Sequence, residues 1–222
     1  MTNNIIFEDA SILAAVKPQG MPAQPDLTGD RSFLEEMEAY AGQPLGLLHR
    51  LDRPVGGVML FAKTKQAEAA LAKDIQEKRL QKSYLAVLTG KLPQEQGSQE
   101  DFLRKNGRTN LSEVVPEGAK GAKRAILEYR RLAEKETENG VLTLAEITLL
   151  TGRHHQIRVQ TSGMGAPIWG DRKYNPRPAR GNIALWAYSL SGTHPKTKQP
   201  FLFRELPQGE PFCLFWEEIS HL

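Results

Sequence analysis

One carboxylate of the chain stands in a setting that suits chemistry. Asp52 lies between Arg50 and Arg53 in the run His49-Arg50-Leu51-Asp52-Arg53-Pro54. A neighbouring arginine favours the ionised form of a carboxylate, which suits a nucleophile better than a proton donor. The alternative interpretation is a structural aspartate that caps a turn before Pro54. The residues alone favour the structural interpretation over the catalytic one.

A second polar cluster is the run Thr151-Gly152-Arg153-His154-His155-Gln156-Ile157-Arg158. It predicts a helix over about 154–161, with Arg153 at its start and with His154 and Arg158 on one face by their i, i+4 spacing. Helix amides and cations together would form an anion-binding surface. A solvent-facing polar helix is the plain alternative.

A metal centre is the other chemistry that these residue types raise. A metal-assisted hydrolase could use His49, Asp52, His154 and His155 as ligands. However, adjacent histidines on a helix point about 100° apart, and no acidic or thiol ligand stands at a useful spacing from them. We therefore expect no metal. The chain also lacks the glycine-rich, Walker-type, Gly-x-Ser-x-Gly and Cys-x-x-Cys motifs, so we expect no cofactor and no serine-hydrolase chemistry.

The distribution of charge favours a polyanionic partner. The net charge is only +3, but residues 104–131 hold eight Lys or Arg against three Glu, and residues 150–181 hold six against one Asp. Clustered cations favour nucleic acid because each contact with a phosphate releases condensed counterions. Solvated basic loops are the alternative.

The elements that position these residues read as a mixture of strands and helices. A capping box at Ser32 and Glu35 predicts a helix to about Tyr40, and Thr64 predicts the start of another. Residues 90–123 read as loop or irregular hairpin. The predicted strands lie over 5–7, 12–16, 58–62, 84–88, 125–131, 141–150, 183–190 and 201–203. Short turns between strands favour an α+β fold with a mostly antiparallel or mixed sheet over a doubly wound one.

Length and composition favour one ordinary globular domain over residues 1–222. The chain has 222 residues, of which 40% are hydrophobic, and its apolar runs are about five residues long, so no membrane span is expected. The N-terminus carries no secretory signal, which predicts a cytoplasmic protein. The single cysteine, Cys213, lies in an apolar run and is expected to be buried. We expect a monomer.

Taken together, the two polar clusters resemble the RluA family of RNA pseudouridine synthases. The family's His-Arg-Leu-Asp, then Gly and a strand ending in Phe-Ala-Lys, is matched by residues 49–52, Gly57 and residues 61–63. Its Thr-Gly-Arg-x-His-Gln-Ile-Arg-Val is matched by residues 151–159. The Gly-x-Pro-Ile-x-Gly-Asp-x-x-Tyr that follows is matched by residues 165–174. Weaker matches are Lys17-Pro18-x-Gly20, Lys82-x-Tyr84, and Ala187-Tyr188 with residues 193–195. The resemblance covers nearly the whole chain.

The resemblance implies a fold, an activity and roles for single residues. It implies the pseudouridine synthase catalytic fold, with a central sheet flanked by helices, and an isomerase that flips a uridine out of structured ribosomal or transfer RNA, such as a stem-loop, and needs no cofactor. Asp52 matches the catalytic aspartate and Arg153 the arginine that pairs with it. Tyr84 matches the tyrosine that packs against the base, and Arg50 the side chain that enters the gap left by the flipped base.

Departures from the family pattern affect RNA contacts more than chemistry. Val55-Gly56-Gly57 replaces the commoner Thr-Ser-Gly, His154 replaces a frequent Thr, and Gln160 stands where His is common. Only about four residues precede the first predicted strand, so this looks like a short form without an N-terminal RNA-binding domain. RNA recognition is then expected from residues 90–123 and the basic windows, with Arg50, His154 and Arg158 as RNA-binding side chains. A catalytically silent RNA-binding protein on the same fold is the alternative function.

Overall fold

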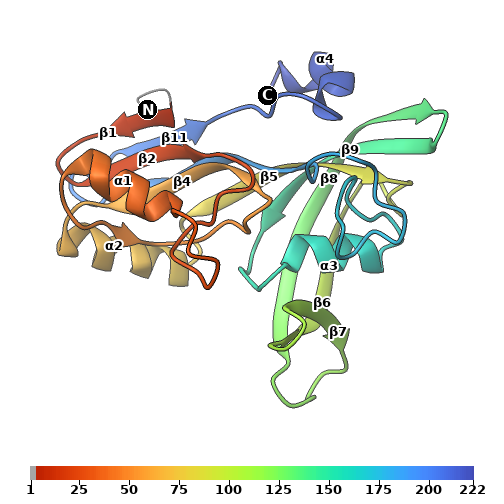
Figure 1. Ribbon diagram of the computed structural model, residues 1–222, viewed down its shortest axis with the longest axis horizontal. Helices are drawn as coiled ribbons and strands as arrows, with labels where there is room; N and C mark the ends of the chain where they lie inside the picture. The colour runs from red at the N-terminus through yellow and green to blue at the C-terminus, as the bar shows by residue number, and fades with distance from the viewer. Residues whose placement is uncertain (1–3) are drawn as a thin grey trace. The chain divides into compact units, whose positions relative to one another are not determined.

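The computed structural model describes residues 4–222, which form two compact units (Figure 1). The first unit contains the chain up to Lys82 together with Trp186–Leu206, and the second contains Ser83–Leu185 and Pro207–Leu222. The single catalytic domain expected over 1–222 stays a prediction. Residues 1–3, which belong to the N-terminus from which the absence of a signal was predicted, lie outside the described residues.

The first unit is built on a mixed sheet in the order β1-β2-β4-β10. Strand β2 is antiparallel to β4, whereas β10 runs parallel to β4 through the pairs Trp186 with Gly56 and Ala187 with Gly57. Strand β3 pairs with β4, and β11 pairs with β10. The strands are β1 (Ile5–Glu8), β2 (Ile12–Lys17), β3 (Gly46–Leu47), β4 (Gly56–Ala62), β10 (Leu185–Thr193) and β11 (Pro200–Arg204).

Two capped helices cover opposite faces of this sheet. Helix α1 (Phe33–Ala41) begins after Ser32, whose side chain accepts from the Glu35 amide while Glu35 accepts from the Ser32 amide, as the capping box predicts. Helix α2 (Lys65–Gln76) begins after Thr64, also as predicted. The ring of Phe33 in α1 packs 5.7 Å from that of Phe61, whereas α2 packs on the alternate residues of β4. The core therefore lies on both faces of β4.

The second unit contains an antiparallel sheet in the order β5-β9-β8-β6-β7. Its strands are β5 (Gln81–Thr89), β6 (Gln96–Asn106), β7 (Leu111–Val115), β8 (Lys123–Thr137) and β9 (Gly140–Leu149). Its helices are α3 (Gln156–Gly163), the 3-10 helix η2 (Phe212–Phe215) and α4 (Trp216–Ile219). Parallel and antiparallel pairings with flanking helices confirm the predicted α+β fold with a mixed sheet. None of the described helices is both long and apolar enough to cross a membrane.

Three local expectations differ from the structure. Residues 90–123, expected to be loop or irregular hairpin, contain the regular β6–β7 hairpin. The start of β6 alternates between more and less exposed polar residues rather than between apolar and polar ones, so the sequence gives no strand signal there. Helix α3 starts two residues later than predicted, since His155 adopts a left-handed conformation with φ of 54°. Cys213, expected to be buried, is exposed in η2.

Candidate active site

Asp52, the predicted catalytic residue, lies on a turn of the first unit just before β4. Asp52 is half-buried, and its backbone carbonyl accepts a hydrogen bond of 2.9 Å from the Val55 amide. Gly56 and Gly57 then allow β10 to approach β4, because a Cβ on Gly57 would lie 2.2 Å from the Ala187 carbonyl oxygen. The turn is therefore attached directly to the most buried strand of the unit.

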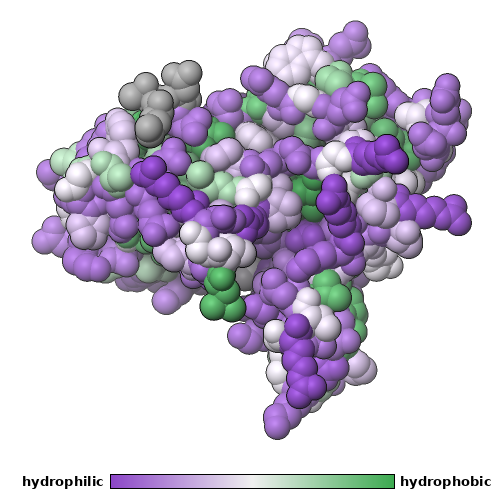
Figure 2. All heavy atoms as spheres, viewed as in Figure 1, coloured by the Kyte–Doolittle hydropathy of each residue, from purple (hydrophilic) through white to green (hydrophobic). Residues whose placement is uncertain are grey.

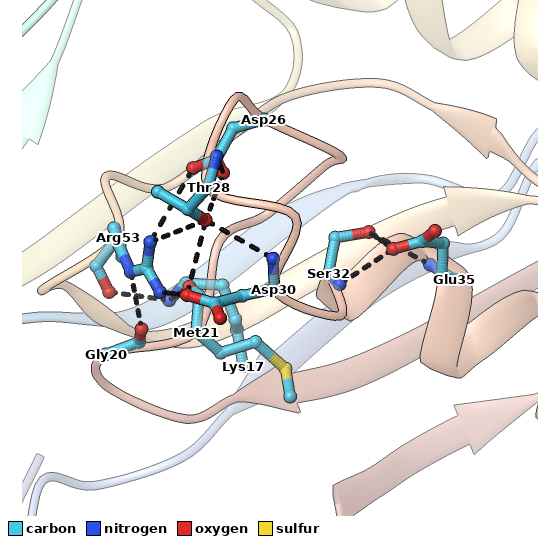
Figure 3. Close-up of polar contacts among 9 residues, drawn as sticks. All are labelled: Lys17, Gly20, Met21, Asp26, Thr28, Asp30, Ser32, Glu35 and Arg53. Atoms are coloured by element: carbon cyan, nitrogen blue, oxygen red, sulfur yellow. Dashed lines mark hydrogen bonds and ion pairs between the residues drawn. The ribbon is translucent and has the colours of Figure 1, made fainter.

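A buried lysine supports the backbone of this turn. Lys17 is 0% exposed, and its ammonium donates to the carbonyl of Pro18 at 2.8 Å. It also donates to the carbonyls of Met21 at 2.7 Å and Arg53 at 3.2 Å (Figure 3). An ammonium has three protons, so these three acceptors satisfy it. The Pro/Gly loop after β2 and the residue that follows Asp52 are thus joined by a single side chain.

The charge of Lys17 is also coupled to Asp52. The pKa of Lys17 is lowered to about 7, because burial lowers it most, the negative charge of Asp52 raises it, and the positive charge of Arg53 lowers it. Sequence reasoning matched Lys17 to a family motif and assigned it no role. The signal that could have found it is a lysine at the end of an apolar strand, directly before a Pro/Gly loop.

The arginines that flank Asp52 in sequence make contacts with the loop over 20–30. Arg53 donates from Nε to the Gly20 carbonyl at 3.0 Å and from Nη1 to Thr28 Oγ1 at 3.0 Å, and it pairs with Asp30 (Figure 3). Arg50 is exposed and donates to Gln24 Oε1 at 3.2 Å. Arg53 thus fixes the loop that borders the Asp52 turn, and the RNA contact of Arg50 stays a prediction.

His49 is a structural residue of the same unit. Its Nε2 accepts from the Leu60 amide of β4 at 3.2 Å. Burial and, to a smaller extent, the positive charge of Lys82 together lower the pKa of His49 to about 3. The imidazole is therefore neutral near pH 7, and its Nε2 is engaged in the hydrogen bond from the Leu60 amide. Among residues 4–222, no three His, Cys, Asp or Glu side chains gather as ligands for a metal ion.

The second unit carries Tyr84 and Arg153. Tyr84 is 6% exposed on β5, where it faces Ile147 of β9 in the register of the sheet. Arg153 is exposed; its Nε donates to the Arg124 carbonyl at 2.9 Å, and its amide donates to Gln156 Oε1 at 3.0 Å. The predicted pairing of Arg153 with Asp52 joins residues of the two units and stays a prediction.

The remaining predicted RNA-binding residues have protein partners in the second unit. Arg158 forms a bidentate pair with Asp171, with distances of 2.8 Å from Nε to Oδ2 and 2.7 Å from Nη2 to Oδ1. The two side chains are only 4% and 0% exposed. A phosphate contact by Arg158 would require this buried pair to open. His154 precedes α3 rather than lying on it, so the predicted shared helix face with Arg158 is wrong, and its ring contacts Ser112.

Comparison with known proteins identifies the family. Residues 11–163 match the family model described as RNA pseudouridylate synthase. The chain is 32% identical over 203 residues to the uncharacterized RNA pseudouridine synthase YhcT of Bacillus subtilis, covering 88% of this chain and 66% of that protein. It is 32% identical over 201 residues to the dual-specificity RNA pseudouridine synthase RluA of Vibrio parahaemolyticus, covering 87% and 79%. The chain therefore belongs to the RluA family of RNA pseudouridine synthases.

Solved structures agree with the fold. The human protein RNA pseudouridylate synthase domain containing 1 superposes with a TM-score of 0.78 at 22% identity, over 95% of this chain and 85% of that one. This likeness shows a pseudouridine synthase fold. The chain spans less than two thirds of the length of some curated relatives, among them a ribosomal large subunit pseudouridine synthase C of Rickettsia bellii, of which it covers 60%.

Proposed function

We propose that the protein is an RNA pseudouridine synthase that isomerises specific uridines of ribosomal or transfer RNA, with Asp52 as the catalytic residue. The observation that carries the proposal is the half-buried Asp52, which lies on a turn whose next residue, Arg53, has its carbonyl held by the buried Lys17 ammonium. Family membership and the relatives named for ribosomal and dual-specificity RNA substrates support the substrate class.

The reaction is an isomerisation and needs no redox partner. The target uridine leaves the stack, because its glycosidic bond is inaccessible inside a helix. The bond between N1 of uracil and C1′ of ribose breaks, the base rotates, and a bond forms between C5 and C1′. One proton leaves C5 and one is taken up at N1, so atoms and charge balance. Asp52 acts either at C1′ or by removing a ribose proton, and Tyr84 supplies a flat face to the base.

The RNA backbone is expected to contact the β6–β7 hairpin and the loop that follows it. Four exposed cations of this segment, Lys105, Arg108, Lys120 and Lys123, form no ion pair among the residues that the structure describes. Neighbouring Arg104 and Arg124 are neutralised by Glu113 and Glu100. Unneutralised exposed cations favour phosphate contacts. We propose a cytoplasmic monomer with one catalytic domain, and Arg153 as the partner of Asp52.

The test measures tritium release from RNA labelled at C5 of uridine, prepared from a strain that lacks the gene, both as free RNA and as ribosomal particles. Wild type is compared with Asp52→Asn, and the matched control is Asp74→Asn in α2, a partly buried carboxylate that pairs with Arg79. Release by wild type and the control, but not by Asp52→Asn, supports the proposal. Release by Asp52→Asn at the wild-type rate refutes the role of Asp52. RNA binding without release from either substrate indicates a silent RNA-binding protein.

A further inference from the structure

Ser112, near the start of β7, is held by His154, which lies outside the sheet. Ser112 is 5% exposed, and its hydroxyl donates to the His154 carbonyl at 2.7 Å. The same hydroxyl oxygen lies 2.9 Å from His154 Nδ1, and Nε2 of that ring lies 3.1 Å from Oδ1 of Asn110. One imidazole therefore contacts both the turn of the β6–β7 hairpin and the strand that leaves it.

A second set of contacts holds the same two hairpin residues. The Tyr174 hydroxyl accepts from the Ser112 amide at 2.6 Å and lies 2.8 Å from His155 Nδ1. Lys173 donates to the Asn110 carbonyl at 2.8 Å. Lys173 and Tyr174 closely follow Asp171, which forms the buried ion pair with Arg158 of α3. This second set of contacts therefore also connects the hairpin to α3.

The backbone before α3 adopts an uncommon conformation that brings the two histidines together. His155 has φ of 54°, in the left-handed region where few residues other than glycine are found. As a result the His154 and His155 rings stack with centroids 3.7 Å apart, whereas neighbours within a helix diverge. Strained backbone persists where surrounding contacts over-determine it. Here the contacts with Ser112 and Tyr174 do so.

The hairpin needs such support because the sheet holds only part of it. Strand β6 pairs with β8 over Gln96–Leu103, and β7 pairs with β6 alone. Residues 104–113 therefore extend past the last partner strand, as the projecting hairpin of the second unit shows (Figure 1). Its projecting end presents mostly hydrophilic side chains on the visible face (Figure 2), and Lys105 and Arg108 are exposed there.

We propose that His154 is a positioning residue that latches the β6–β7 hairpin to the start of α3 through Ser112 and so sets the direction in which the hairpin tip meets the RNA backbone. The inference rests on the proposed function for the identity of the RNA ligand. It differs from the direct RNA contact predicted for His154 from the sequence, since here the ring acts through Ser112, a buried residue.

The latch is tested first without RNA, by native-state trypsin digestion. Cleavage after Lys105 and Arg108, identified by mass spectrometry, is expected to be about threefold to tenfold faster in His154→Ala and Ser112→Ala, because one or two hydrogen bonds that hold the hairpin are lost. The matched control is Ser98→Ala at the other end of β6, which removes a hydroxyl that donates to the carbonyl of Leu127 in β8. His154→Gln, whose amide can still donate to Ser112, should cleave at an intermediate rate. Equal rates in wild type and His154→Ala overturn the latch.

The functional part is tested by a double-mutant cycle on RNA affinity. Binding of purified ribosomal RNA and of bulk transfer RNA is measured for wild type, His154→Ala, Ser112→Ala and the double variant. Each single variant is expected to weaken binding about threefold to tenfold, and the double variant by less than the product of the two single effects, because both variants remove the contact between Ser112 Oγ and His154 Nδ1. In turnover assays KM for RNA should rise with kcat unchanged.

Direct contact and failure of the enzyme give different results. If His154 touches RNA itself, Ser112→Ala binds RNA like wild type and the effects of the two changes add, which overturns the positioning role. If the cycle is non-additive and the digestion rates differ as expected while wild type releases no tritium, the latch stands and the proposed activity is refuted.

Discussion

The indole of Trp186 occupies the volume that a side chain at position 56 would fill. A Cβ placed on Gly56 would lie 2.3 Å from Cζ3 of Trp186, and the two residues face each other where β10 runs parallel to β4. The Trp186 ring is fixed in turn by a hydrogen bond of 2.8 Å from its Nε1 to the Glu205 carbonyl. Gly56 is also where the family pattern usually has Ser, so glycine and tryptophan here form a matched pair.

Gly56→Ala is expected to destabilise the protein by about 1–3 kcal/mol, the usual cost of overpacking. Because the obstacle is a side chain, Trp186→Leu should remove most of this additional cost when the two changes are combined. Gly57→Ala offers the contrast: its Cβ would meet the Ala187 backbone, so no side-chain change should rescue it. Urea unfolding of the four variants measures the free energies. A Gly56→Ala protein as stable as wild type would contradict the packing argument.

Removal of the Lys17 ammonium is expected to loosen the turn that carries Asp52. Lys17→Met leaves the carbonyls of Pro18, Met21 and Arg53 without their donor, and hydrogen bonds to charged groups contribute about 1.5–3 kcal/mol. We expect a loss of about 2–4 kcal/mol in unfolding free energy, together with a fall in kcat. The matched control is Lys63→Met, whose partly exposed pair with Glu8 should matter by less than about 1 kcal/mol. Equal losses in both variants would count against the anchoring role.

Acid sensitivity is expected from His49. Burial lowers its pKa to about 3 from an ordinary value near 6.5. Between these values the unfolded chain binds a proton that the folded chain does not, so the unfolding free energy falls as the pH decreases from about 6.5 to 3, by at most about 1.4 kcal/mol per pH unit. The difference between urea titrations of wild type and His49→Gln over this range isolates the effect. A difference profile that is flat below pH 6.5 would refute it.

The Arg158–Asp171 pair is expected to act in stability rather than in RNA binding. Asp171→Asn leaves a buried guanidinium uncompensated, which should cost about 3–5 kcal/mol. Replacement of both residues, by Met at 158 and Leu at 171, should cost less than that single change.

Arg108→Ala at the exposed hairpin tip should instead leave stability unchanged and reduce the salt dependence of RNA binding by about one phosphate contact. If Arg158→Met folds and its RNA binding depends less on salt than that of wild type, the RNA contact predicted for Arg158 from the sequence is supported instead.

Local sequence signals predicted the parts of the fold that short segments determine. The capping residues Ser32 and Thr64 placed the starts of α1 and α2 because a cap is decided within four residues. Residues 90–123 were expected to be loop or irregular hairpin rather than the regular β6–β7 hairpin, since the first six residues of β6 are glycine or polar and no apolar period marks them. The left-handed His155 could not be read from residue type, and it moved the start of α3.

The candidate site divides in the same way. A run of consecutive residues singled out Asp52, and the motif around Arg153 singled out that arginine. The role of Lys17 depends on a carbonyl 36 residues away in sequence, and the burial of Arg158 depends on Asp171, 13 residues away. Neither distance in space is encoded by spacing along the chain. Sequence patterns therefore indicate which side chains carry chemistry more readily than which ones hold them in place.

The exposed Cys213 makes the protein straightforward to label. It is the single cysteine of the 222 residues and lies in η2 of the second unit, the unit that also carries the β6–β7 hairpin. A maleimide fluorophore would therefore attach at one position without prior mutagenesis, and its emission would report on the surroundings of that position in the second unit. A second dye on a cysteine introduced near the hairpin tip, for example at Thr109, would turn hairpin motion into a change in energy-transfer efficiency.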